Sequence, residues 1–241
     1  MTLTGMVRTG LRQLFSCLAP PRCRLCRAPL LDHDNAFLCP DCATKCEWIG
    51  EGACRGCGYP AGPHASHGDE CRRCRGNKLR LTAAAAVARY HSGAKELVLG
   101  LKFRGETELA RPMAGLMAAR LRAVAFPGVD IILPVALHSA RRRGRGFDQA
   151  EMLAHFLALH THIPTASRLL WRVRHTSPQT TLRREARLHN MSGAFRASPQ
   201  LIGLNILLVD DVMTTGATMA SCAEVCREAG ARRVYGLVFA R

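Results

Sequence analysis

The stretch Asn205-Ile-Leu-Leu-Val-Asp-Asp-Val-Met-Thr-Thr-Gly-Ala-Thr218 decides the fold of this 241-residue chain. It opens with an uninterrupted apolar run over 206–209, which is typical of a strand buried on both faces in a parallel sheet. Two adjacent carboxylates, Asp210 and Asp211, follow, and a hydroxyl-rich loop with a glycine spans 214–218. A helical pattern over 219–229, closed by Gly230, comes next. A strand, a loop and a helix in this order predict an α/β fold.

The order of these residues also has a chemical meaning. Ligands of open α/β sheets bind at the carboxyl ends of the strands, where the two carboxylates can accept hydrogen bonds from a vicinal diol. The loop behind them offers hydroxyls, backbone N–H groups and a helix N-terminus, which together favour a phosphate, and Gly216 lets the backbone approach closely. A diol and a phosphate one loop apart describe a ribose 5-phosphate. The alternative is a buried strand followed by a capped turn.

The composition predicts a globular protein without membrane insertion. No segment approaches the roughly 18 consecutive apolar residues of a membrane span. Residues 1–20 are interrupted by Arg8 and Arg12, so they make a poor signal peptide and predict a short amphipathic helix. We therefore expect a cytoplasmic protein, long enough to bury one large core or two smaller ones.

The net charge points to an anionic partner. The formal charge is +16 at pH 7, and arginine supplies most of the excess. The planar guanidinium can bind two phosphate oxygens at once, so a basic surface of this size suggests a polyanion, with nucleic acid the obvious candidate.

Four Cys-x-x-Cys pairs lie between residues 23 and 74. Each pair can supply two thiolates from one turn, and two pairs complete a four-cysteine zinc site. With no export signal, the twelve cysteines of the chain indicate metal rather than disulfides. The gaps favour sequential pairing, although interleaved pairing stays open. The first site would hold Cys23, Cys26, Cys39 and Cys42, and the second Cys54, Cys57, Cys71 and Cys74.

These zinc sites are predicted to be structural. All four positions of each ion are filled, which leaves none open for catalysis, and the segment has few large apolar residues, so the metal must supply its folding energy. His64 and His67 lie in the loop of the second site, either as surplus ligands or as solvated side chains. Cys222 and Cys226 share one helical face and are expected to pack against the sheet.

The remaining pattern alternates strands and helices. Strands are predicted over 82–90, 129–135, 168–174 and 233–240, and helices over 91–101, 106–125 and 149–159, with a break at 102–105. The polar stretch 175–190 is long for a connection within a compact domain, which usually marks a lid or a binding loop.

A basic, glycine-containing loop follows the strand at 129–135. Its arginines have the right chemistry for a pyrophosphate or a nucleic-acid backbone, whereas the simpler interpretation is a solvated face. They are Arg141, Arg142, Arg143 and Arg145.

Taken together, these motifs resemble one family, the ComF family of competence-associated phosphoribosyltransferase-like proteins, including its GntX branch linked to the use of external DNA. The resemblance rests on the four Cys-x-x-Cys pairs, Leu101-Lys-Phe-Arg-Gly105, Arg-Gly-Phe-Asp-Gln at 145–149, Thr176-Ser-Pro-Gln179 and the run 206–218. This last run is similar to the phosphoribosyl pyrophosphate (PRPP) signature of type I phosphoribosyltransferases. Ala136 and Asp148 depart from it, since family members usually have proline and asparagine there.

The resemblance implies an N-terminal helix over 1–22, a double zinc ribbon over 23–78, and a phosphoribosyltransferase-like domain with a mostly parallel sheet over 79–241. In that family the acidic pair binds the ribose hydroxyls and the loop binds the 5-phosphate, with Mg²⁺ accompanying PRPP. The implied PRPP-binding residues are Asp210, Asp211, Val212, Met213, Thr214, Thr215, Gly216, Ala217 and Thr218, with Asp210 and Asp211 as catalytic candidates.

Three functional hypotheses follow from the motifs and the resemblance. The first is cytosolic handling of imported single-stranded DNA, in competence or nutrition, alongside a DNA-uptake helicase or processing proteins. Because aromatic residues are scarce, such binding would depend mainly on phosphate contacts. The second is an active PRPP-dependent transferase acting on an unidentified base or amine. The third is a scaffold whose pocket is a relic.

Overall fold

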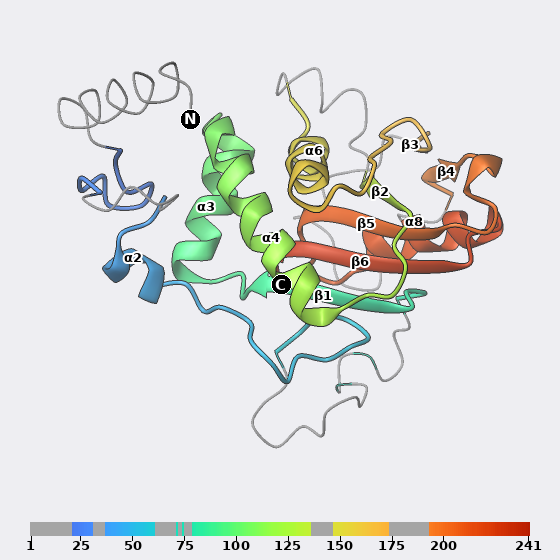
Figure 1. Cartoon of the computed structure of the whole chain (residues 1–241), viewed down its shortest axis with the longest axis horizontal. Coiled ribbons are helices and arrows are strands. Elements are labelled where there is room, and N and C mark those ends of the chain that lie inside the picture. The colour runs from blue at the N-terminus through green and yellow to red at the C-terminus, as the bar shows by residue number, and fades with distance from the viewer. Residues whose placement is uncertain are drawn as a thin grey trace, which may run out of the picture.

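The computed structural model describes residues 21–30, 37–60, 71, 74, 79–135, 147–173 and 193–241 (Figure 1). Several sequence predictions fall outside these residues. They are the helix over 1–20, the histidines at 64 and 67, the arginines at 141–145 and the element at 176–179.

A four-stranded parallel sheet forms the centre of the molecule. Its strands are β1 (Ala83–Ala88), β6 (Arg233–Ala240), β5 (Asn205–Val212) and β2 (Ile131–Pro134), in that spatial order, and every neighbouring pair is parallel. The carboxyl ends of all four strands therefore meet at one edge. This arrangement confirms the predicted α/β fold with a central parallel sheet.

Helices cover both faces of the sheet. On one face, α3 (Ser92–Phe103), the short helix η1 (Thr107–Leu109), α4 (Ala110–Val124) and α6 (Gln149–Thr161) pack against Leu207 and Val209 of β5. On the other, α8 (Ala217–Glu228) packs against Ile206 and Leu208. Successive residues of β5 thus enter opposite cores, which explains why its apolar run shows no alternation.

A small antiparallel ladder extends the second face. It pairs β3 (Leu170–Arg172) with β4 (Phe195–Ala197), and η3 (Pro199–Leu201) follows β4. The strand expected over 168–174 is confirmed, whereas its partner β4 was not predicted. Leu170 and Phe195 are fully buried and join the core beneath α8.

Three predicted boundaries were wrong. The first helix continues through Lys102 and ends at Phe103, and the second begins as the turn η1, so Glu106 precedes its helical residues. Strand β5 extends through Val212, because it keeps pairing with β6 up to the last residues of that strand. The acidic pair therefore lies inside the strand rather than after it.

The cysteine-rich segment lies along the outer edge of β1. Its backbone amides and carbonyls bond to that strand and its flanks, as in Ile49 N–H to Val87 O at 2.8 Å and Ala84 N–H to Arg55 O at 2.7 Å. An isolated antiparallel bridge joins Trp48 to Ala88. These contacts cover an edge whose backbone groups would otherwise be unpaired. The segment also contributes the short helix α2 (Pro40–Thr44).

No helix within the described ranges is both long enough and apolar enough to cross a bilayer.

Candidate functional site

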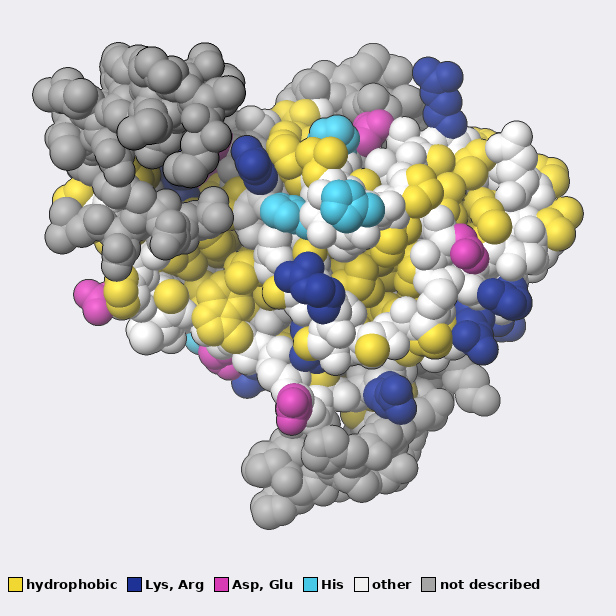
Figure 2. Space-filling view, viewed as in Figure 1, with side chains coloured by type: hydrophobic (Ala, Val, Ile, Leu, Met, Phe, Trp, Pro, Cys, Tyr) yellow, Lys and Arg dark blue, Asp and Glu magenta, His cyan; other side chains and the backbone are white. Residues whose placement is uncertain are grey.

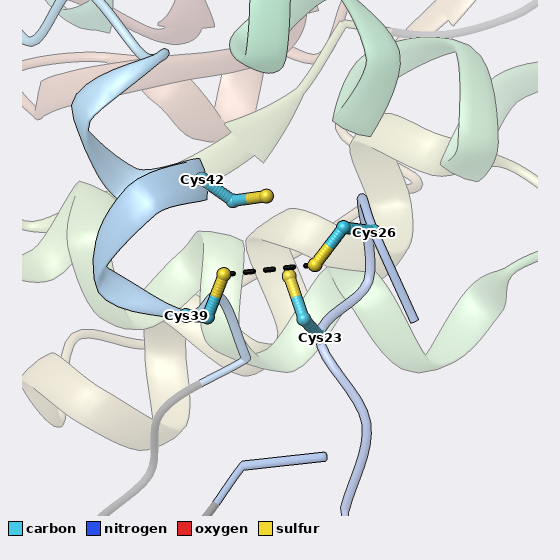
Figure 3. A group of neighbouring side chains, drawn as sticks. All are labelled: Cys23, Cys26, Cys39 and Cys42. Atoms are coloured by element: carbon cyan, nitrogen blue, oxygen red, sulfur yellow. Dashed lines mark hydrogen bonds between the residues drawn. The ribbon is translucent and has the colours of Figure 1, made fainter. Parts of the chain in front are cut away.

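The eight paired cysteines gather into two groups of four in sequential order. Cys23, Cys26, Cys39 and Cys42 form the first group (Figure 3), and Cys54, Cys57, Cys71 and Cys74 form the second; within each, the sulfurs lie within 4.8 Å of one another. The sequential pairing is therefore confirmed over the interleaved one.

The spacing of the sulfurs fits a zinc ion. The Sγ–Sγ distances are 3.6 Å for Cys26–Cys39 and 3.7 Å for Cys54–Cys74. Four thiolates bound to zinc at about 2.3 Å in a tetrahedron would lie about 3.8 Å apart. Four converging thiolates are also the donor set of structural zinc sites, so each group can hold one ion with all positions filled.

The two groups are built on the same turn. The bridge Arg22–Pro29 closes the first, and Ala53–Pro60 closes the second. In each, the residue after the second cysteine has a positive φ, 64° at Arg27 and 68° at Gly58. Only the second position requires glycine for space, because a Cβ at Gly58 would lie 2.9 Å from the backbone of Ala85 in β1. This close approach seats the second turn against the sheet.

The second candidate site is the loop between β5 and α8. Gly216 has φ +84°, a conformation that favours glycine, and a Cβ there would displace the end of the Leu79 side chain. Thr215 Oγ1 accepts a hydrogen bond from Ala217 N–H at 3.3 Å, at the start of α8. The loop surrounds a hollow of about 50 Å³ lined by Asp210, Val212, Met213, Thr214, Thr215, Gly216, Ala217, Thr218 and Met219.

The two carboxylates face different surroundings. Asp211 is buried, with 4% of its surface exposed, and its Oδ2 lies 3.0 Å from Nζ of Lys102 on α3. Asp210 lines the hollow of the loop, and its Oδ1 accepts a hydrogen bond from Asp211 N–H at 2.8 Å. Asp210 is among the residues that line the hollow, whereas Asp211 is not. The structure therefore brings Asp210, but not Asp211, to the loop.

Burial raises the pKa of Asp210 well above its usual value, and the charge of Asp211 raises it further. The nearby Lys102 only partly offsets this effect. A cation or a hydrogen-bond donor placed at Asp210 would favour its ionised form. Asp210 is therefore the carboxylate that gains most from a bound ligand.

Sequence reasoning missed two residues that shape this site. Lys102 was assigned to a helix break, yet it is the ion-pair partner of Asp211. No role was predicted for Arg241. Its Nη1 donates to the carbonyl of Met213 at 2.7 Å and to that of Thr214, and its Nε donates to the carbonyl of Cys57 at 3.0 Å. The only sequence signal was the place of Lys102 in the Leu101–Gly105 motif.

Comparison with known proteins identifies the family. Residues 14–75 match the model of the double zinc ribbon domain. The chain is 34% identical over 220 residues to the DNA utilization protein YhgH of Salmonella typhi, covering 89% of this chain and 94% of the relative. The chain belongs to the ComF/YhgH family. Competence protein F of Haemophilus influenzae, another ComF/YhgH protein, is 28% identical over 90% of this chain and 96% of its own length.

One solved structure resembles part of this ComF/YhgH chain. It is the glutamine PRPP amidotransferase of Bacillus subtilis complexed with ADP and GMP, with a TM-score of 0.37 and 23% identity, covering 54% of this chain and 26% of that chain. This overlap is too loose to indicate a function. The family membership and the double zinc ribbon nevertheless confirm the resemblance found in the sequence.

Proposed function

We propose that this chain handles imported single-stranded DNA in the cytoplasm, during competence or the use of DNA as a nutrient, and that residues 210–218 bind a phosphoribosyl ligand. The names of its relatives, a DNA utilization protein and a competence protein, support the first part. The observation that carries the second is the junction of β5 and α8, where a partly buried carboxylate faces a glycine loop at a helix N-terminus.

In this proposal the loop holds the phosphate and Asp210 holds the ribose. Backbone N–H groups at the start of α8 and the hydroxyls of Thr214, Thr215 and Thr218 suit a 5-phosphate. Asp210 would accept a hydrogen bond from a ribose hydroxyl or contact the Mg²⁺ that accompanies PRPP. Asp211 would act through Lys102, by fixing the end of β5 rather than by touching the ligand.

Transfer chemistry is the second candidate, and one contact favours it. Val135, the residue after β2, donates its N–H to the carbonyl of Val209 at 2.8 Å. Val135 therefore lies beside the carboxyl end of β5, and the arginines at 141–145 follow it in the sequence. In a transferase, their charges could stabilise a pyrophosphate leaving group. A transferase would use Asp210 to hold the ribose while the arginines stabilise the departing charge.

DNA binding would depend on charge spread over the surface. Figure 2 shows Lys and Arg side chains at several separate places on one face, with apolar side chains between them. Such a distribution suits contacts with successive phosphates rather than one deep site. The affinity for single-stranded DNA should then fall steeply as salt is raised.

Thermal melting of the zinc-loaded protein tests the pocket. PRPP with Mg²⁺ should raise the midpoint, with a gain of about 2.7 kcal/mol at a hundredfold excess over the dissociation constant. Ribose 5-phosphate is the control for phosphate and ribose binding alone. Asp210→Asn should remove the shift without loss of zinc. A wild-type protein that melts identically with and without PRPP would contradict the pocket.

Fluorescence anisotropy with a labelled single-stranded oligonucleotide tests the DNA part separately. Binding that weakens with salt, and that survives Asp210→Asn, supports DNA handling independent of the pocket. Release of pyrophosphate from PRPP upon addition of a base or amine would favour the transferase. Absence of oligonucleotide binding even at low salt would contradict direct DNA handling.

A further inference from the structure

A second, larger cavity lies at the opposite edge of the sheet from Asp210. Its volume is about 750 Å³, within the roughly 300–1,000 Å³ of small-molecule sites. The ribbon segment 50–55, the start of β1, the end of α4 with residues 125–127, and the start of β6 line it. Because strands β1 and β6 contribute their first residues, this ribbon–α4 cavity opens at the amino ends of the strands.

Three arginines from three different elements line the ribbon–α4 cavity. They are Arg55 of the ribbon, Arg120 of α4 and Arg233 of β6, with Glu51 as the single acidic residue among the lining positions. Within the described part of the chain, none of these four side chains forms an ion pair. Among the described residues, the lining therefore carries an excess of positive charge, with three arginines and one glutamate.

Arg120 is the most informative of the three. Its Nε is buried and, within the described residues, has no hydrogen-bond partner. Burial lowers the pKa of its guanidinium. A buried guanidinium donor without an acceptor is unfavourable, since the group has lost water without gaining a partner. Arg120 also lines the cavity, where an anion could accept hydrogen bonds from the rest of its guanidinium.

The same cavity has an aromatic wall. Phe126 and Tyr235 both line it and stack on one another, with ring centroids 4.7 Å apart and planes 10° apart. Tyr235 is held in place by a hydrogen bond from its hydroxyl to the carbonyl of Pro127 at 3.2 Å, whereas Phe126 stays partly exposed. A flat apolar ring beside unpaired guanidinium groups is suited to a ligand that combines a planar base with a phosphate.

We infer that the ribbon–α4 cavity binds a nucleoside phosphate, either a free nucleotide or a nucleotide within a single strand. Arg120 and Arg233 would bind the phosphate, and the base would lie against Phe126. This inference does not depend on the phosphoribosyl pocket, because the two sites share no lining residue and lie at opposite ends of the strands. Since the ribbon supplies Arg55 and one wall, the site requires a folded second zinc group.

Calorimetric titration of the full zinc-loaded chain with deoxyadenosine monophosphate tests the inference. Inorganic phosphate and deoxyadenosine, each offering half of the ligand, should bind at least about tenfold more weakly. Arg120→Met keeps the length and apolar character of the side chain but removes the guanidinium, so it should weaken nucleotide binding about tenfold or more. Arg122→Met is the matched control, because Arg122 is exposed on the same helix and does not line the cavity.

Further variants keep the test decisive. Arg233→Met changes an exposed side chain, so it reports on binding even if Arg120→Met impairs folding, which circular dichroism and zinc content would reveal. The inference is overturned if the nucleotide shows no binding at millimolar concentration, or if Arg122→Met weakens binding as much as Arg120→Met and Arg233→Met do.

A competition experiment identifies the source of the nucleotide. An oligothymidylate that displaces the bound monophosphate, and whose own affinity falls in Arg120→Met, would place a nucleotide of a single strand in the cavity. An oligothymidylate that leaves the monophosphate bound would assign the site to free nucleotides. Either result supports the cavity as a nucleoside phosphate site.

Discussion

Arg241 donates a hydrogen bond from Nε to the carbonyl of Cys57 at 3.0 Å, so the last residue of the chain is tied to a predicted zinc ligand. The same guanidinium donates from Nη1 to the carbonyl of Met213 and lies 5.9 Å from the ring centre of Tyr59. One side chain therefore holds the turn at Cys54–Cys57 against the loop between β5 and α8. The order of the loop and the folding of the ribbon should be coupled through this contact.

Replacing Arg241 with Met should destabilise both the turn that contains Cys57 and the loop that begins at Met213. The carbonyls of Cys57 and Met213 would lose their charged donor, at a cost of about 1–3 kcal/mol in the free energy of unfolding. Urea unfolding and the PRPP-induced melting shift measure the two effects. Arg232→Met is the control, because it loses one hydrogen bond, to Asn205 Oδ1, at the other end of β6. Equal losses in both variants would contradict a specific coupling.

Removal of zinc should detach the ribbon from β1. Cys54→Ser should lower the metal content from two ions to one per chain and reduce the melting temperature, since a structural zinc site contributes folding energy directly. Metal analysis combined with calorimetry measures both. Cys222→Ser is the control, because Cys222 is a buried thiol on α8 outside both groups. A protein that keeps two ions after the Cys54 change would contradict the assigned ligands.

Because the pKa of Asp210 is raised, Asp210→Asn should increase the melting temperature by an amount that depends on pH. The folded protein holds the proton of this carboxyl more tightly than the unfolded chain, whose value is near 3.8. The resulting stability is present below that value and is lost as pH rises through the folded pKa. The amide is neutral throughout, so its advantage in melting temperature should grow from about pH 4 toward neutrality.

Differential scanning calorimetry across this range, without ligand, measures the effect. Glu228→Gln on the exposed end of α8 controls for the change in net charge. An Asp210→Asn advantage that is constant with pH would show that the carboxyl does not titrate as its burial predicts.

Lys102 should matter for stability more than its position at a helix end implies. Lys102→Met would leave Asp211 buried without its cation, costing about 2–4 kcal/mol, somewhat below a fully buried pair because 28% of the lysine side chain is exposed. Adding Asp211→Asn should restore part of the loss. Lys95→Met, exposed on the same helix, should change little in urea unfolding. A double variant no better than the single one would contradict the pair.

The features that could be predicted from the sequence are those formed by residues close to one another along the chain. The apolar run before Asp210 predicted β5, and the spacing of the cysteine pairs predicted both metal groups. The ion pair of Lys102 with Asp211 spans 109 positions, and the contact of Arg241 with Cys57 spans 184. Such contacts are created by strand order, which local patterns do not encode. The finding that only Asp210 of the acidic pair lines the loop was not predicted, because the end of β5 was placed three residues too early.

Gly216 should be the least replaceable residue of the loop, for two separable reasons. Its φ of +84° disfavours any side chain, and a Cβ would overlap the end of the Leu79 side chain. Gly216→Ala should therefore cost more than the roughly 1–3 kcal/mol of a strained backbone alone. Gly203→Ala isolates the backbone part, because Gly203 has φ +75° with open space around its Cβ.

Urea unfolding of the variants separates the two contributions to the loss at Gly216. Leu79→Ala combined with Gly216→Ala should recover the steric part only, leaving a loss close to that of Gly203→Ala. The PRPP melting shift should stay weak in the double variant, since the displaced backbone could no longer follow the phosphate. If Gly216→Ala costs no more than Gly203→Ala, the loop does not pack against Leu79 as the structure describes.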